Sequence, residues 1–121
     1  MTLRVDNPES ARWYEMDQFG VGGVVEVEAV LEQQDPVLEL RLGNREGDVL
    51  FNLVSDRKVT KITTSLSEET VDSGDLSLGG LEKVRVVVAP QSEGVFVDLV
   101  GVGSVLLFYP PASWIENRNT A

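Results

Sequence analysis

The chain has 121 residues, a length typical of one domain whose core needs no disulfide or metal. Twenty acidic and ten basic residues give it a net charge of −10, which disfavours binding to nucleic acid and to anionic membranes. The absence of cysteine and histidine excludes disulfides and thiolate chemistry, and it removes the commonest general base and metal ligand.

This composition predicts a protein that is not an enzyme and that has no catalytic residue, no metal and no cofactor. The first residues, Met-Thr-Leu-Arg-Val-Asp, lack the apolar region of a signal peptide, so we expect a cytoplasmic protein as synthesised, with export by another route left open. The apolar runs are too short to span a bilayer, and we therefore expect no membrane insertion.

The N-terminal part contains aromatic residues followed by two runs of alternating apolar and charged residues. Trp13, Tyr14 and Phe19 are expected to pack as an edge strand or a lid over the core. The alternation in VVEVEAVL (24–31) and VLELRL (37–42) predicts two strands with one face in the core and one in water.

The rest of the chain contains further strand patterns separated by turn residues. We expect a loop over 66–80 that includes a short strand at 69–72, and a polar tail over 115–121. The remaining strands are predicted at 49–54, 58–65, 82–89, 95–100 and 105–109. Because short turns join them and no segment has a convincing helical period, the sequence predicts one all-β domain over residues 1–121. Its architecture would be an antiparallel two-sheet sandwich with a core at about 19–111.

The last three strands carry apolar residues on both faces. In the predicted strands, Phe96, Val100, Leu106 and Phe108 point away from the side occupied by Val95, Val97 and Val105. One face would be in the core and the other would be free to meet a partner, which indicates a homo-oligomer.

Two short acidic patterns have ordinary structural interpretations beside chemical ones. Asp72-Ser73-Gly74-Asp75 resembles half of a calcium loop, but position twelve is Lys83, and the same residues form a good turn. Glu26 and Glu28 could act as paired carboxylates, but alternating glutamates are also typical of the wet face of a strand.

The order of these elements resembles the galectin domain over residues 19–111. A Gly-led strand (GVGGVVEVEAVL) precedes PVLELRLG, DVLFNLVSDR and VTKITTS, and a closing meander ends in VLLFYP. Phe51-Asn52 matches the Phe-Asn of the galectin His-Phe-Asn-Pro-Arg strand. The resemblance implies a galectin-like jelly-roll sandwich and a carbohydrate site on one sheet.

Carried over residue by residue, the resemblance implies four candidate carbohydrate-binding residues. Asn52 falls on the asparagine of the family, and Arg57 lies three residues beyond the position of its arginine. Thr64-Ser65 stands in place of the family's Asn-Ser pair, and Glu69 lies close to the position of its Glu-x-Arg pair, which is missing here. The family's histidine is replaced by Leu50, and residues 66–80 contain no tryptophan, so we expect the usual β-galactoside site to be lost.

The sequence therefore predicts a non-catalytic binding module whose ligand is a glycan or a protein surface. The first alternative is a structural or assembly subunit that self-associates through its apolar C-terminal strands. The second is an acidic inhibitor or nucleic-acid mimic that occupies a basic site on its target.

Overall fold

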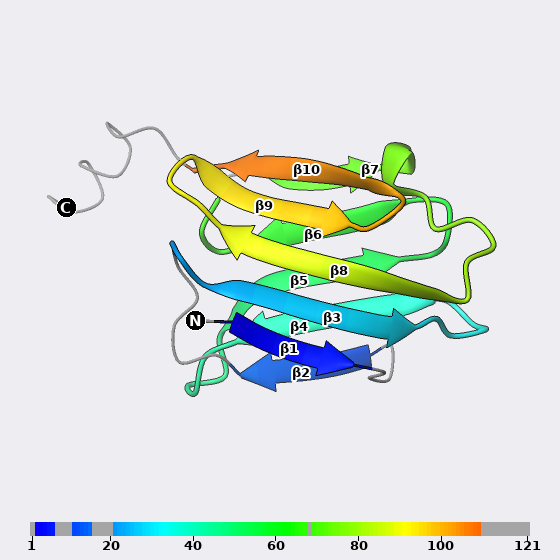
Figure 1. Ribbon diagram of the computed structural model, residues 1–121, viewed down its shortest axis with the longest axis horizontal. Coiled ribbons are helices and arrows are strands. Elements are labelled where there is room, and N and C mark those ends of the chain that lie inside the picture. The colour runs from blue at the N-terminus through cyan, green and yellow to red at the C-terminus, as the bar shows by residue number, and fades with distance from the viewer. Residues whose placement is uncertain (1, 7–10, 16–20, 68, 110–121) are drawn as a thin grey trace, which may run out of the picture.

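The computed structural model describes residues 2–6, 11–15, 21–67 and 69–109 of the chain. These residues form ten strands and one short 3-10 helix, shown in Figure 1. The elements are β1 (Thr2–Asp6), β2 (Ala11–Glu15), β3 (Val24–Val30), β4 (Leu38–Gly43), β5 (Val49–Ser55), β6 (Thr60–Thr64), β7 (Thr70–Ser73), η1 (Gly74–Leu76), β8 (Lys83–Pro90), β9 (Gly94–Leu99) and β10 (Gly103–Phe108).

The strands form two sheets that lie face to face (Figure 1). Sheet A has the order β1-β3-β8-β9-β10, and sheet B has the order β2-β4-β5-β6-β7. Four neighbouring strands of each sheet are antiparallel, whereas β1 pairs parallel to β3 and β2 pairs parallel to β4. The all-β two-sheet sandwich predicted from the sequence is therefore confirmed, and each sheet also has a parallel edge strand.

Alternating burial along the strands builds the core between the two sheets. In β3 and β8 every second residue is buried, as the alternation of apolar and charged residues requires. Among the residues whose burial the structure describes, Phe51 on β5 is the largest fully buried side chain, and Leu76 and Leu78, from η1 and the segment after it, belong to the same core. One hydrophobic cluster thus extends over both sheets, which is the arrangement expected of a single domain.

Most of the expected strands are present, with shifts of one or two residues at their ends. The strand expected within 66–80 is β7, and the edge strand expected around Trp13 and Tyr14 is β2, whereas Phe19 and the tail at 115–121 lie outside the described residues. The strand β1 was not anticipated, although Leu3 and Val5 alternate with polar residues in the sequence. In the described ranges, no helix has the length and apolar character needed to cross a membrane.

Candidate functional site

The structure places the four candidate carbohydrate-binding residues at separate positions. Asn52 lies in the middle of β5, and Arg57 lies in the turn that follows this strand. Thr64 ends β6 and pairs with Phe51, near the opposite end of β5. Glu69 immediately precedes β7. The fold therefore does not bring these four side chains together into one site.

Asn52 lies on the outer face of sheet B, between buried neighbours that point into the core. It is in register with Arg41 on β4 and Thr63 on β6, and Thr63 is in register with Thr70 on β7. On the backbone, Trp13 of β2 is in register with Arg41. The Oδ1 atom of Asn52 is buried and has no hydrogen-bond partner among the residues that the structure describes. A buried acceptor without a donor is costly, so this atom is suited to accept a hydrogen bond from a ligand.

The hydroxyl of Thr64 stabilises the turn between β6 and β7. Its Oγ1 donates to the carbonyl of Leu50 at 2.8 Å and accepts a bond from the N–H of Leu66 at 3.1 Å. The N–H of Ser65 donates to the same Leu50 carbonyl at 3.0 Å. These bonds fix the end of β6 and give Thr64 a structural role in the turn.

Glu69 joins the β6–β7 connection of sheet B to the last strand of sheet A. Its Oε2 accepts a hydrogen bond from the N–H of Phe108 at 2.9 Å, and the hydroxyl of Ser67 donates to the carbonyl of Phe108. Ser67 also accepts a bond from the N–H of Glu69 at 3.1 Å. The two side chains thus occupy both backbone groups of Phe108 at one end of β10.

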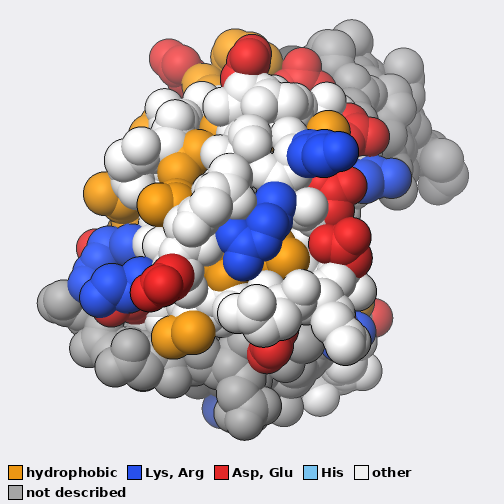
Figure 2. All heavy atoms as spheres, turned by 90° about the vertical axis from the view of Figure 1, so that its right-hand side faces the viewer, with side chains coloured by type: hydrophobic (Ala, Val, Ile, Leu, Met, Phe, Trp, Pro, Cys, Tyr) orange, Lys and Arg blue, Asp and Glu red, His pale blue; other side chains and the backbone are white. Residues whose placement is uncertain are grey.

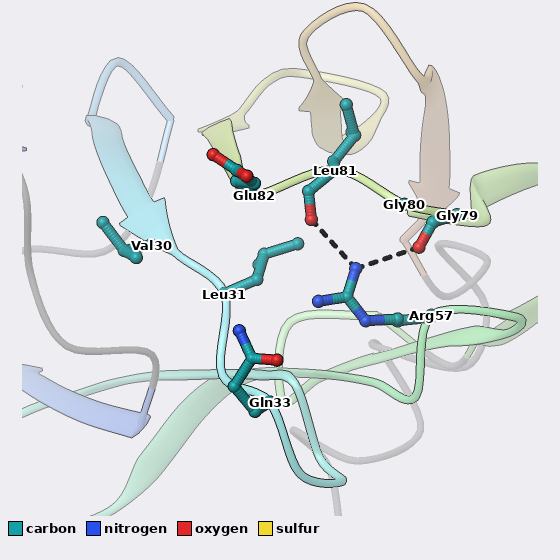
Figure 3. Close-up of a pocket in the computed structure, with 8 residues that line it drawn as sticks. All are labelled: Val30, Leu31, Gln33, Arg57, Gly79, Gly80, Leu81 and Glu82. Carbon is teal, nitrogen blue, oxygen red and sulfur yellow. Dashed lines mark hydrogen bonds between the residues drawn. The ribbon is translucent and has the colours of Figure 1, made fainter.

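Arg57 holds three loops together at one end of the sandwich. Its Nη1 donates to the carbonyls of Gly79 and Leu81, each at 2.9 Å, and its Nη2 donates to the carbonyl of Glu32 at 3.4 Å. Its own carbonyl accepts from the N–H of Leu78 and Gly79. Arg57 thus links the β3–β4 loop, the β5–β6 turn and the segment before β8, as Figure 3 shows in part.

The turn that carries Arg57 is fixed by a neighbouring carboxylate. Asp56 Oδ1 accepts bonds from the N–H of Val59 at 2.8 Å and of Lys58 at 2.9 Å, and these bonds lower the pKa of Asp56 below its ordinary value. The charged carboxylate thereby stabilises a turn in which Arg57 has a φ of 83°. This conformation is unfavourable for a residue with a side chain, and it costs on the order of 1–3 kcal/mol.

The outer face of sheet A is charged over β3 and β8 and mixed over β9 and β10, where Asp98 of β9 is in register with Ser104 of β10. Over β3 and β8, Glu28 pairs with Arg85 at 2.9 Å and with Lys83 at 3.7 Å. Over β8, β9 and β10, a row of apolar residues in register crosses the sheet: Ala89, Phe96 and Leu106. Phe108 lies two residues beyond Leu106 on the same face of β10, and 53% of its surface is exposed. This apolar row ends at the edge of the sheet.

The edge strand β10 leaves backbone groups unpaired in the middle of its length. The N–H and C=O of Phe108 face away from β9, because they bind Glu69 and Ser67. Backbone groups alternate sides along a strand, so those of Leu106 and Ser104 face the same edge. Within the described ranges no other group hydrogen-bonds to these two residues across that edge.

The strand β10 itself carries none of the charges that commonly protect a free strand, and the carboxylate of Glu69 lies at one end of its edge. No charged residue occurs between Leu99 and Tyr109, although one residue in four of the chain is charged. The uncharged run is visible in the sequence, but the sequence does not show that this run forms the strand at the border of sheet A.

The end of the sandwich that carries the Arg57 turn shows a mixed surface. Figure 2 shows acidic and basic side chains interleaved there, with hydrophobic side chains between them. The concentrated negative face expected of a nucleic-acid mimic is not present on this end. Asp72, Ser73 and Asp75 belong to the end of β7 and to η1, where the Ser73 hydroxyl accepts the N–H of Asp75. The described residues contain no group of three or more side chains suited to hold a metal ion.

Comparison with known proteins adds no assignment to this geometry. No protein-family model, no curated protein and no solved structure matches the chain. The galectin-like resemblance therefore stays a prediction.

Proposed function

We propose that the chain is a non-catalytic assembly module that binds a second copy of itself through the free edge of β10. The observation that carries this proposal is an uncharged edge strand with unpaired backbone groups at Ser104 and Leu106, whose neighbours on β9 are Asp98 and Phe96. An open edge of this kind is a template for pairing with another strand.

A two-fold axis through Val105 would satisfy the open groups of both chains. Two antiparallel copies of β10 centred on this residue place Ser104 opposite Leu106 of the other copy, and Leu106 opposite its Ser104. Both residues direct their backbone groups to the free edge, so each opposed pair can exchange two hydrogen bonds. The pairing leaves Phe108 bonded to Glu69 and Ser67.

The distribution of charge supports this surface over the rest of the molecule. Two chains of charge −10 repel each other, and contact is least unfavourable where both surfaces are uncharged. The strand β10 has no charged residue, and Asp98 is the one charged residue in register with it on β9, whereas Glu28, Lys83 and Arg85 lie together over β3 and β8. Pairing at the edge would also bring the half-buried Leu106 and the exposed Phe108 of both copies onto one surface.

Lysine at both Ser104 and Leu106 should convert a dimer of this chain into a monomer. In the proposed register, each new ammonium group lies opposite another, and like charges directly opposite across two strands are destabilising. Sedimentation-velocity ultracentrifugation over a concentration series should show the wild-type chain at the mass of two copies, and S104K/L106K at the mass of one.

A double variant with the same added charge serves as the matched control. Val49 and Val59 are 48% and 38% exposed and lie at the start of β5 and in the β5–β6 turn. V49K/V59K should remain dimeric, because neither residue lies on β10. A wild-type chain that sediments as a monomer at every concentration would remove the proposal, and so would loss of the dimer in the control variant.

Carbohydrate binding on the outer face of sheet B is the second candidate function. It is supported by the buried Oδ1 atom of Asn52, which lacks a donor, and by the polar row formed by Arg41, Asn52, Thr63 and Thr70. A sugar hydroxyl can donate to such an acceptor while neighbouring hydroxyls bind the rest of the ring.

A broad glycan array tests this candidate with two variants. Asn52→Ala should abolish any signal, whereas Arg57→Ala should retain it, because the Arg57 side chain binds loop carbonyls beyond the end of β5. An array with no wild-type signal would exclude carbohydrate as the ligand. Loss of signal in both variants would instead support one site that spans both residues, as the sequence resemblance implies.

A further inference from the structure

A cavity with a volume of about 560 Å³ opens beside Arg57, away from β10. Its lining comes from the end of β3, the β3–β4 loop, the β5–β6 turn and the segment before β8: Val30, Leu31, Gln33, Arg57, Gly79, Gly80, Leu81 and Glu82 (Figure 3). Volumes of this size are typical of sites for small molecules, which combine apolar walls with a few fixed polar groups.

The guanidinium group of Arg57 is held in place before any ligand arrives. Three backbone carbonyls accept its hydrogen bonds, and two of these bonds, to Gly79 and Leu81, are drawn in Figure 3. The backbone of Arg57 is fixed by Ser77, whose hydroxyl donates to its carbonyl at 2.6 Å, and by Leu78. A long side chain that is already ordered loses little entropy on binding, so it is a favourable ligand contact.

Two donors of this guanidinium remain unused. Arginine has five N–H donors, and three of them bind Gly79, Leu81 and Glu32, which leaves Nε–H and one hydrogen of Nη2. In the described part of the chain, no carboxylate lies within 4.0 Å of Arg57. Figure 3 shows Nη2 directed toward Leu31 and Gln33. Neighbouring N–H groups of arginine form the fork that binds both oxygens of a carboxylate.

The walls of the cavity restrict the rest of the ligand. Leu31 is buried, and in Figure 3 its side chain points toward the guanidinium, whereas that of Leu81 points away from it, so an apolar group can pack against Leu31. Glu82 lines the side away from the guanidinium in Figure 3, where its charge disfavours a second anionic group. From these contacts we infer that the cavity binds a small monocarboxylate with an apolar body, its carboxylate on Arg57 and its apolar part against Leu31.

Titration of the ¹⁵N-labelled full chain with phenylacetate and with hexanoate, followed by NMR, tests this inference. The amide signals of residues 30–33, 57 and 79–82 should shift and saturate with both compounds. Phenylacetamide has nearly the same shape without the charge, and it should bind about tenfold more weakly or worse, because it lacks a charge-assisted bond. Shifts that fail to appear at these amides would overturn the inference, as would equal affinity for phenylacetamide.

Two variants separate binding from the structural role of Arg57. Arg57→Lys keeps the charge but loses the fork, and it should weaken phenylacetate binding about tenfold. Arg57→Lys also loosens the loops, so Gly80→Leu is used as a second variant. A Cβ at position 80 would have no other atom within 4 Å, and the leucine side chain should narrow the cavity while Arg57 keeps its hydrogen bonds to the loop carbonyls.

The matched control for Gly80→Leu is a leucine at an exposed position outside the cavity. Ser92 is exposed in the β8–β9 turn, far from the cavity, and Ser92→Leu should bind phenylacetate as the wild-type chain does. Retention of wild-type affinity in Gly80→Leu would place the bound carboxylate outside the cavity and overturn the inference. Because this site is separate from β10, the result is independent of the proposed dimer.

Discussion

Replacing Gly94 by alanine should lower the free energy of unfolding by about 3 kcal/mol or more. Gly94 is buried at the start of β9, opposite Phe108. A Cβ at this position would lie 2.2 Å from the carbonyl oxygen of Leu107 and 3.0 Å from the Cα of Phe108. All of the clashing atoms belong to the backbone, so the two strands would have to separate there.

Urea unfolding followed by circular dichroism measures this effect, and Gly80→Ala is the control. Gly80 has open space around its missing Cβ and no positive φ, so alanine there should leave stability within about 0.5 kcal/mol of the wild-type value. An alanine at position 94 that unfolds at the wild-type urea concentration would show that β9 and β10 are not in this close contact.

The local elements could be predicted from the sequence because their signal is local. Alternation in residues 24–31 marks β3 and the side of each residue, and the structure confirms that Val25, Val27 and Ala29 are buried. The opposite faces assigned to Phe96 and Val97 are likewise confirmed by their burial. In such strands each residue's environment follows from its neighbours in the chain.

The arrangement of the strands could not be predicted, because it depends on contacts between distant residues. Nothing in the segment Thr2–Asp6 specifies parallel pairing with β3, and β3 has its other neighbour, β8, more than fifty residues further along the chain. Which strands form the edges follows from this order. The free edge of β10 is therefore a property of the fold, although its lack of charge is a property of the sequence.

The candidate site residues illustrate the same division. The sequence could indicate that Arg57 follows a strand, but its partners lie 22 to 25 residues away in two other loops. Glu69 binds the backbone of a residue 39 positions further on. A polar side chain in a sequence carries no information about which distant carbonyl or N–H will reach it, so its role becomes visible only in the fold.

Alanine at Phe51 and alanine at Asn52 should have opposite consequences, although the residues are adjacent. Phe51 is fully buried between the sheets, and Phe51→Ala should lower the free energy of unfolding by about 3–5 kcal/mol, because it removes a large side chain and leaves a cavity. Asn52 lies on the outer face, where its Oδ1 atom is buried without a partner. Asn52→Ala should change stability by less than about 0.5 kcal/mol or increase it, because an unsatisfied acceptor is removed.

Urea unfolding of both variants, with Phe51→Leu as a third, separates the contributions. Leucine fills part of the space, so its cost should lie between those of wild type and Phe51→Ala. A loss of 2 kcal/mol or more in Asn52→Ala, on the scale of about 1–3 kcal/mol for a broken buried hydrogen bond, would contradict the assignment and show that Asn52 makes a structural bond. A stable Asn52→Ala variant would instead mean that the amide is dispensable for folding. In that case, any loss of ligand binding in Asn52→Ala can be assigned to the missing amide on sheet B, because the variant is as stably folded as the wild-type chain.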